Sequence, residues 1–342
     1  MGTDLAAIDL FSGCGGLSLG LQRAGFRILA AVDTDELAME TYRLNHSGVK
    51  TINKDIRKVS PNRLMKTLGL RKGQLALLAG CPPCQGFSTL RTLNGKNDID
   101  EPMNDLIFEF VRFVRAFLPR AIMIENVPGL ANDERIVAFR KRIEKLGYTH
   151  ATKVLDASDF GVPQRRKRMI MIAVRNAKAV EFAAPSKRKR SVRGAIKSLS
   201  APEKSRDPMH NYETRRTPGV LKRISKVPKD GGSRSDLRKN YRLACHDRCS
   251  GFKDVYGRMR WSAPAPTITG GCINPSKGRF LHPEQDRAIT LREAAMLQGF
   301  PKSYNFEMRR GLYPTAQMIG NAFPPEFAAR HAKTIKRKLA TT

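Results

Sequence analysis

The sequence predicts an α/β fold in which a Rossmann-like, doubly wound domain accompanies a smaller, irregular and basic domain. Apolar runs alternate with helix-periodic segments from the N-terminus to about residue 175, the order expected for a sheet with helices on both faces. A glycine-rich turn follows the first apolar run, as in doubly wound folds that bind a cofactor. Beyond that half of the chain, helical periodicity fades and basic residues accumulate.

Composition restricts the class of partner. The chain has 342 residues, which favours two domains, and its formal net charge of +31 predicts a polyanionic partner. No apolar run approaches the roughly 20 residues that span a bilayer, so nucleic acid is favoured over a membrane surface. Six scattered cysteines without an export signal indicate a reducing compartment. We therefore expect a monomer in the bacterial cytoplasm or nucleoid.

The first predicted strand, residues 6–11, runs into the turn Ser12–Gly16 and then a helix that ends near Gly25. Glycines in such a turn let the backbone approach a ligand closely. A second strand, residues 28–32, ends at Asp33, about twenty residues after the turn, where an acidic residue can accept hydrogen bonds from ribose. Capping of the following helix, residues 36–45, is an equally good explanation of Asp33.

A third apolar run, residues 74–79, leads into Gly80-Cys81-Pro82-Pro83-Cys84 and predicts a buried strand followed by a rigid turn. Ligands of open α/β sheets bind outside the carboxyl ends of the strands, so a nucleophile there makes chemical sense. Cys81 and Cys84 also have the spacing of a redox pair or half a zinc site, and either could be a small buried residue. The prolines argue against a metal knuckle because they remove backbone donors.

The remaining elements continue the alternation. We predict helices over 105–117 and 133–146, and strands over 120–125, 149–155 and 168–174. The strand that begins at Arg120 brings the Glu125 carboxylate to its carboxyl end. Residues 89–103 predict a mobile loop, Thr290 starts a capped helix that Gly299 and Pro301 end, and a basic helix closes the chain from Glu326.

Residues 187–260 contain 22 Lys and Arg but 7 Asp and Glu, which is about half of the net charge in under a quarter of the chain. Tyr212, Tyr241, Phe252, Tyr256 and Trp261 are interspersed among them. A solvated surface would explain a short charge run, but interleaved aromatics over this length favour a nucleic-acid surface. We therefore assign residues 1–182 and 288–342 to one discontinuous domain and residues 183–287 to the basic domain.

Taken in order, the motifs resemble those of the cytosine-5 DNA methyltransferase family. They are the cofactor motif Asp9–Gly16, the nucleophile motif Gly80–Ser88, the acid motif Glu125–Val127, the arginine motif Gln164–Arg168 and the terminal motif Gly320–Ala322. The match covers nearly the whole chain in the family's unpermuted order. The resemblance implies a DNA (cytosine-5)-methyltransferase that uses S-adenosylmethionine, with residues 183–287 as its target-recognition domain.

By this resemblance Cys84 adds to carbon 6 of a flipped cytosine, because carbon 5 alone is too weak a nucleophile to accept the methyl group. Glu125 holds ring nitrogen 3 and the exocyclic amine, Arg168 binds the base oxygen and positions Glu125, and Arg166 lies near the Cys84 turn. The base that removes the proton from carbon 5 is not identified.

The resemblance also implies a cofactor pocket and DNA contacts. The residues expected around S-adenosylmethionine are Phe11, Gly13, Gly16, Asp33, Asp55, Ile56, Pro83, Leu106, Asn321 and Ala322. Those expected to contact double-stranded DNA are Ser88, Arg260, Thr267 and Thr269. Thr34 stands where many relatives have a large residue that stacks on adenine, so this stacking is lost. A cognate restriction endonuclease is the expected functional partner.

Two rival functions remain at this point. A transfer-RNA cytosine-5 methyltransferase has the same fold and nucleophile but a shorter insert, and a non-catalytic DNA-binding relative would need none of the catalytic groups. Cys245, His246 and Cys249 could be zinc ligands, yet no second pair lies nearby at finger spacing, so a surface or core role is favoured and no metal is expected.

Overall fold

The structure, a computed structural model, describes residues 5–83, 106–243 and 254–341. The chain divides into two compact units. The sheet unit comprises Met1–Phe160, Lys167–Pro185 and Phe323–Thr342, and the second unit comprises Gly161–Arg166 and Ser186–Ala322. Predictions for Cys84, Ser88, the loop 89–103 and the pair Cys245 and Cys249 lie outside the described residues.

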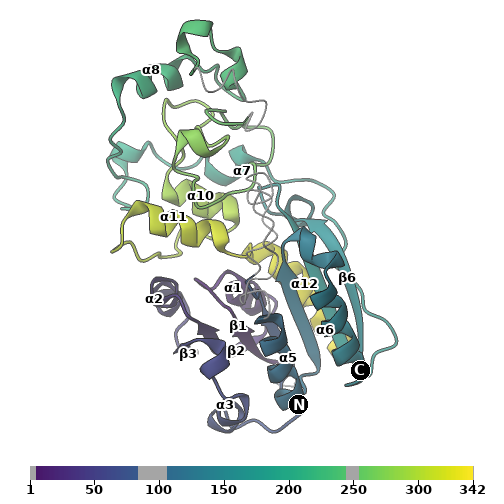
Figure 1. The fold of residues 1–342 in the computed structure, drawn as a ribbon. Coiled ribbons are helices and arrows are strands. Elements are labelled where there is room, and N and C mark those ends of the chain that lie inside the picture. Colours follow the sequence, from purple (N-terminus) through teal and green to yellow (C-terminus); the bar gives the residue numbers. More distant parts are fainter. Residues whose placement is uncertain (1–4, 84–105, 244–253, 342) are drawn as a thin grey trace. The chain divides into compact units, whose positions relative to one another are not determined.

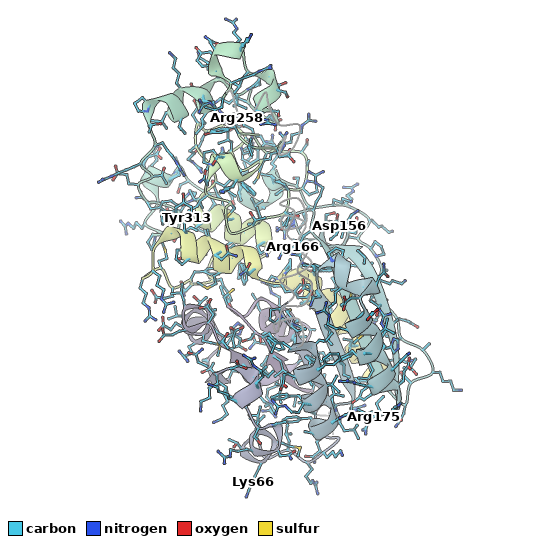
Figure 2. All side chains as sticks on the ribbon, viewed as in Figure 1. Lys66, Asp156, Arg166, Arg175, Arg258 and Tyr313 are labelled. Atoms are coloured by element: carbon cyan, nitrogen blue, oxygen red, sulfur yellow. The ribbon has the colours of Figure 1, made fainter. Side chains whose placement is uncertain are left out.

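The sheet has seven strands in the order β3-β2-β1-β4-β5-β7-β6 (Figure 1). Their bounds are β1 (Ala6–Leu10), β2 (Arg27–Asp33), β3 (Lys50–Asn53), β4 (Leu77–Gly80), β5 (Ala121–Asn126), β6 (Tyr148–Asp156) and β7 (Lys167–Arg175). β1 to β5 pair in parallel, whereas β7 is antiparallel to both of its neighbours. Asp156 and Arg175, the last residues of β6 and β7, accordingly lie at opposite ends of this strand pair (Figure 2). The carboxyl ends of β1 to β5 and the start of β7 therefore lie at the same end of the sheet.

Helices cover both faces because the central strands are apolar on both sides. Ile8 and Leu10 of β1 belong to the main core with α5 and α6, whereas Ala31 of β2 packs with Met39 and Tyr42 of α2. α3 lies beside α5, α5 beside α6, and α1 packs on the C-terminal helix α12. The helices of this unit are α1 (Gly16–Arg23), α2 (Glu36–Asn45), α3 (Pro61–Thr67), α5 (Leu106–Phe117), α6 (Glu134–Glu144) and α12 (Pro325–Leu339). The predicted α/β fold with a doubly wound sheet is confirmed.

The second unit has short helices around a polar interior. They are α7 (Val192–Ile196), α8 (Pro218–Lys226), α10 (Leu291–Gln298) and α11 (Leu312–Asn321). The Arg258 side chain is fully buried and donates to the carbonyl oxygens of Ile224, Val227, His282 and Gln285. It also pairs with the Asp286 carboxylate at 2.5 Å. A buried guanidinium is tolerated here because protein acceptors replace its water.

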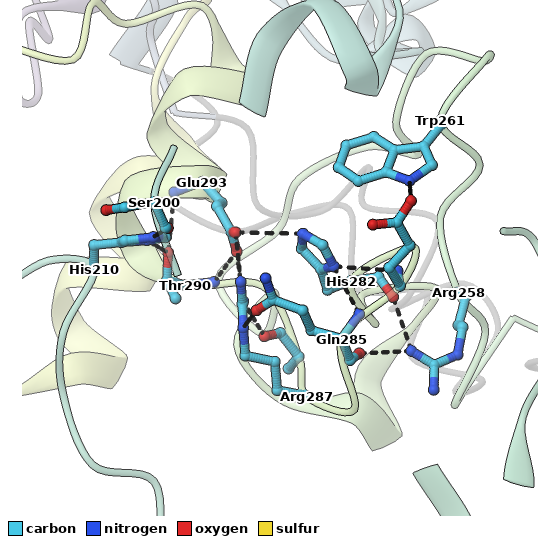
Figure 3. A network of polar contacts seen from close by, with 11 residues as sticks. Ser200, His210, Arg258, Trp261, His282, Gln285, Arg287, Thr290 and Glu293 are labelled. Atoms are coloured by element: carbon cyan, nitrogen blue, oxygen red, sulfur yellow. Dashed lines mark hydrogen bonds and ion pairs between the residues drawn. The ribbon is translucent and has the colours of Figure 1, made fainter. Parts of the chain in front are cut away.

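A second polar network joins the start of α10 to this interior (Figure 3). Thr290 and Glu293 form the capping box that the sequence predicts, and Gly299 ends the helix in the left-handed conformation with φ 100°. Arg287 binds both carboxylate oxygens of Glu293 at 2.7 Å. Burial lowers the pKa of His282, beside this carboxylate, to about 4, so its ring is neutral at neutral pH.

Two of the interleaved aromatics, Tyr256 and Trp261, do not form a nucleic-acid surface, and the sequence prediction is wrong for them. Tyr256 and Trp261 are each 4% exposed, and the Trp261 indole donates to Glu284 at 2.6 Å. The Tyr212 hydroxyl accepts the backbone N–H of Leu291. Tyr256 and Trp261 thus pack in the interior of this unit beside aliphatic residues, while most of the lysines and arginines around them stay outside.

The predicted strands and helices of the sheet unit are confirmed to within a few residues. β3, α3 and α11 carry no clear apolar period and were not predicted; β3, for example, is a half-exposed terminal strand. The division at residues 183–287 stays a prediction, because it concerns target recognition and compactness does not test that. Among the described residues no helix has the length and apolarity needed to cross a membrane.

Gly20→Ala should test the packing of α1 on α12. A Cβ atom at Gly20 would overlap the Ala328 side chain and the Pro325 carbonyl oxygen. Alanine normally favours a helix over glycine, but here overpacking should lower the free energy of unfolding by about 1–3 kcal/mol. Gly219→Ala in α8, where a Cβ atom meets nothing within 4 Å, is the control and should be neutral or slightly stabilising. Urea unfolding of both variants measures the difference, and equal stabilities would contradict this packing.

Candidate active site

The turns after β1 and β4 start side by side. Gly80 pairs with Leu10 in the parallel ladder, and the backbone N–H of Cys81 donates to the Leu10 carbonyl at 3.2 Å. A Cβ atom at Gly80 would overlap that carbonyl oxygen, so glycine is required for the strands to approach this closely. The glycine-rich turn and the cysteine turn therefore leave the sheet from neighbouring strands.

The glycine-rich turn has an unusual backbone. Phe11 has φ 60°, Gly13 φ 50° and Gly15 φ 93°, and Gly15 precedes the first residue of α1, the buried Gly16. The Gly13 N–H donates to Asp33 Oδ2 at 2.7 Å, so the turn is bonded to the end of β2. A Cβ atom at Gly13 would meet no atom within 4 Å, which leaves open space beside the turn. The turn can thus present its backbone to a ligand.

Asp33, Asp55 and Ile56 follow β2 and β3 at the same edge. Asp33 Oδ1 accepts the N–H of Asp35, which is the residue that caps α2, so capping does not explain Asp33. Burial raises the pKa of Asp33. Asp55 caps the 3-10 turn Ile56–Lys58, and its ion pair with Arg57 lowers the pKa of Asp55 to about 2.

Leu106 and Pro83 complete the part of the predicted cofactor set that lies in the sheet unit. Leu106 is the first residue of α5, and both side chains are half-buried. Arg112, one and a half turns along α5, donates to the carbonyls of Ile56 and Val59 at 2.6 and 2.8 Å. These bonds hold the segment after β3 against α5.

Glu125 and Arg168 form the ionic centre at the end of β5. Arg168 Nε lies 2.9 Å from Glu125 Oε1, and the two side chains are 16% and 10% exposed. Arg168 reaches Glu125 from the start of β7, which pairs antiparallel with β5. The predicted contact between Arg168 and Glu125 is therefore present.

Cys81 and Asn126 tie the cysteine turn to the same centre. Asn126 Nδ2 donates to the Pro82 carbonyl at 2.8 Å, and its Oδ1 accepts the Val127 N–H. The Cys81 thiol hydrogen-bonds to Glu125, and burial together with this carboxylate keeps the pKa of Cys81 well above its usual value. Cys81 is thus a protonated neighbour of Glu125 and a poor candidate for a thiolate. The acid motif Glu125–Val127 included Asn126, but the sequence did not predict that its side chain binds the Pro82 carbonyl.

The remaining predicted residues lie in the second unit. Arg166 is buried and donates to the carbonyls of Ile268 and Gly320 at 3.1 and 3.0 Å. Its role near Cys84 stays a prediction. Asn321 is exposed and accepts a bond from Gln317, whereas Ala322 is buried and its carbonyl accepts from Gln298.

Of the predicted DNA contacts that the structure describes, Arg260 is exposed. Thr267 donates to the Arg165 carbonyl at 2.8 Å, and the Thr269 carbonyl accepts the Cys272 N–H at 3.1 Å. These bonds fix the segment that contains both threonines but do not test contact with DNA.

A buried polar chain supports the glycine turn and was not predicted. Tyr42 donates to Ser18 and Ser18 to Asp9, each at 2.7 Å, which connects α2, α1 and β1. Burial raises the pKa of Asp9 to about 7. Among the described residues no group of three or more His, Cys, Asp or Glu could hold a metal ion.

Comparison with known proteins identifies the family. A model of the C-5 cytosine-specific DNA methylase family matches residues 5–337. The chain is 37% identical to the Type II methylase M.HgiDII of Herpetosiphon aurantiacus, over 98% of this chain and 96% of that one. It is 34% identical to the Type II methyltransferase M1.HphI of Haemophilus parahaemolyticus, over 97% and 86% of the two chains.

A solved structure agrees with the fold. A variant of DNMT2 from Spodoptera frugiperda matches 97% of this chain and 99% of its own, with a TM-score of 0.67 and 18% identity. At this identity the likeness concerns the fold alone. With the matched motifs, the sheet order and the two close relatives, the chain belongs to the C-5 cytosine-specific DNA methylase family.

Proposed function

We propose that this chain methylates carbon 5 of a cytosine in double-stranded DNA, with S-adenosylmethionine as the methyl donor. The observation that carries the proposal is the Glu125–Arg168 pair at the end of β5. Asn126 binds the Pro82 carbonyl there, two residues before Cys84. A carboxylate and a guanidinium thus meet at the end of this strand. With the Cys84 thiol proposed as nucleophile, they make up the set needed for addition to a pyrimidine ring.

The residues at the glycine turn fit S-adenosylmethionine. The open space beside Gly13 allows close approach of a ligand, and the Asp33 carboxylate beyond it is suited to ribose hydroxyls. Phe11, Gly16, Asp55, Ile56, Pro83 and Leu106 would hold the rest of the cofactor, and Asn321 and Ala322 of the terminal motif would contribute as well. When bound, the cofactor supplies an electrophilic methyl group.

The protein side chains prepare the base. The Cys84 thiolate forms a bond to carbon 6, and electron density moves to carbon 5. Glu125 binds ring nitrogen 3 and the exocyclic amine, where charge develops, and Arg168 fixes Glu125 while it binds the base oxygen. Arg166 lies near the Cys84 turn in this proposal. Once carbon 5 carries the methyl group, with S-adenosylhomocysteine as the other product, a base removes the carbon 5 proton, the bond to Cys84 breaks and the ring is restored.

The basic segment supports a duplex substrate. The target carbon lies inside the stack, so the cytosine has to be flipped out while other residues hold the duplex. Residues 183–287 would do so as a target-recognition domain, with Ser88, Arg260, Thr267 and Thr269 in contact with DNA. We propose a monomer of the bacterial cytoplasm whose functional partner is a restriction endonuclease.

Cys84→Ser should reduce kcat at least about a thousandfold, because a hydroxyl is far less acidic than a thiol. Cys81→Ala is the control and should stay within about tenfold of the wild type, since Cys81 touches Glu125 but forms no bond to substrate. Tritiated methyl transfer measures both variants, on duplex DNA and on total transfer RNA. Transfer to RNA alone would support the RNA-modifying rival, and unchanged activity in Cys84→Ser would overturn the proposed nucleophile.

Glu125→Gln should lower kcat about 100- to 1000-fold while duplex binding stays intact, because the amide cannot supply the charge that the ring needs. Glu134→Gln, an exposed position at the start of α6, loses the same charge and should behave as the wild type. Single-turnover methyl transfer and a DNA-binding titration separate the two effects. Equal kcat in both variants would exclude Glu125 from the chemistry.

Asp33→Asn should weaken S-adenosylmethionine binding about 10- to 100-fold through loss of a charged acceptor. Asp35→Asn is the matched control, because asparagine also caps a helix and α2 should stay intact. Isothermal titration calorimetry of the cofactor with each variant measures the change. Weaker binding in Asp35→Asn than in Asp33→Asn would contradict the assignment of Asp33 to the ribose.

A further inference from the structure

A polar pocket lies on the sheet unit at its outer strand, and its lining includes none of the residues assigned to methyl transfer. It has a volume of about 440 Å³, and its walls come from β6, α6 and the 3-10 turn Pro128–Asn132. Arg140, His150, Thr152 and Lys153 line it together with Ala131 and Asn132. β6 ends the sheet, so it pairs with β7 on one side only, and alternate N–H groups face away from the sheet.

Three residues of the wall each have a buried polar atom without a hydrogen-bond partner in the protein. These atoms are Arg140 Nε, His150 Nδ1 and Thr152 Oγ1. The same side chains are anchored elsewhere: Arg140 Nη2 donates to the Ala131 carbonyl at 3.2 Å, and His150 Nε2 lies 2.8 Å from Glu144 Oε1. Unmatched groups of this kind are rare in folded proteins, and here they cluster at one pocket.

The charges around the pocket favour an anion. Burial lowers the pKa of Arg140, so its cationic form lacks solvent stabilisation that an anion would replace. Glu144 is the acidic neighbour, and it is already paired with His150. The Lys153 ammonium lies 5.2 Å from the centre of the Phe182 ring, so Lys153 adds positive charge nearby but is held by this contact.

The geometry points to a phosphate-binding site formed by Arg140, His150 and Thr152. Phosphate oxygens accept from the Arg140 Nε–H and the Thr152 hydroxyl. His150 Nε2 faces Glu144, which leaves Nδ1 for the phosphate: an Nδ1 without a proton accepts from a protonated phosphate oxygen. A backbone phosphodiester has no such proton, so the contacts with Arg140 and Thr152 are the ones that both sources of phosphate share.

The side-chain ¹⁵N resonances of His150 in the full chain test this site. The protein has six histidines, and His150→Gln assigns the signal. Inorganic phosphate added at constant ionic strength should shift the Nδ1 resonance saturably. Arg140→Gln and Thr152→Val should each weaken that binding roughly tenfold or more. Arg142→Gln removes the same charge from the same helix, but this guanidinium lies over the Phe108 ring 4.3 Å away, so it should bind as the wild type does.

The proposed site is ruled out if phosphate does not shift the Nδ1 resonance of His150. It is also ruled out if Arg140→Gln and Thr152→Val bind phosphate as tightly as Arg142→Gln does. Thermal unfolding of each variant shows that it is folded, and two variants on different elements prevent a folding defect from deciding the outcome. A duplex oligonucleotide in a parallel titration separates the sources. A shift with phosphate alone assigns a free phosphate or monoester, and a shift with both assigns the DNA backbone. Methyl transfer should persist in Thr152→Val, so failure of this site leaves the proposed reaction untouched.

Discussion

The contact between Gly80 and the Leu10 carbonyl is the constraint on which the active edge depends. β1 and β4 can run this close only because Gly80 has no side chain, and the Cys81 N–H then bonds to the same carbonyl. The glycine-rich turn and the cysteine turn therefore begin from a single fixed point. Parallel pairing supplies the rest, since the strands of such a sheet end at one edge.

Because β7 is antiparallel to β5, its first residues lie beside the last residues of β5. A parallel neighbour of β5 would bring its last residues to the active edge, after which the chain turns away into a helix. β7 brings its first residues instead, so Arg168 stands beside Glu125 while the strand behind it is buried in the sheet. Both members of the ion pair thus lie on strands rather than loops, which limits their motion. This is the preorganisation that the proposed reaction requires.

The sequence was sufficient where one local pattern decides the structure. The apolar runs of β1, β4 and β5 and the capping box at Thr290 predicted their elements, and the motif order predicted the contact between Arg168 and Glu125. Prediction from the sequence failed where contacts between residues far apart in the chain determine which side chains are buried. A tryptophan or tyrosine in the sequence can lie in a core or on a nucleic-acid surface, and Trp261 and Tyr256 are buried. The hydrogen bond from Asn126 to Pro82 joins residues 44 positions apart.

The second unit shows why the net charge of a sequence is a poor measure of the positive charge on the protein surface. Besides aliphatic residues such as Ile224 and Leu281, its interior holds aromatic rings and even the Arg258 side chain. Arg258 is stable there because four carbonyl oxygens and Asp286 surround it, and its charge therefore holds the backbone together. Each buried arginine of this kind adds to the net charge but not to the positive charge on the surface. The basic surface consists of the exposed arginines and lysines, among them Arg260, whereas the buried Arg258 stabilises the backbone beneath them.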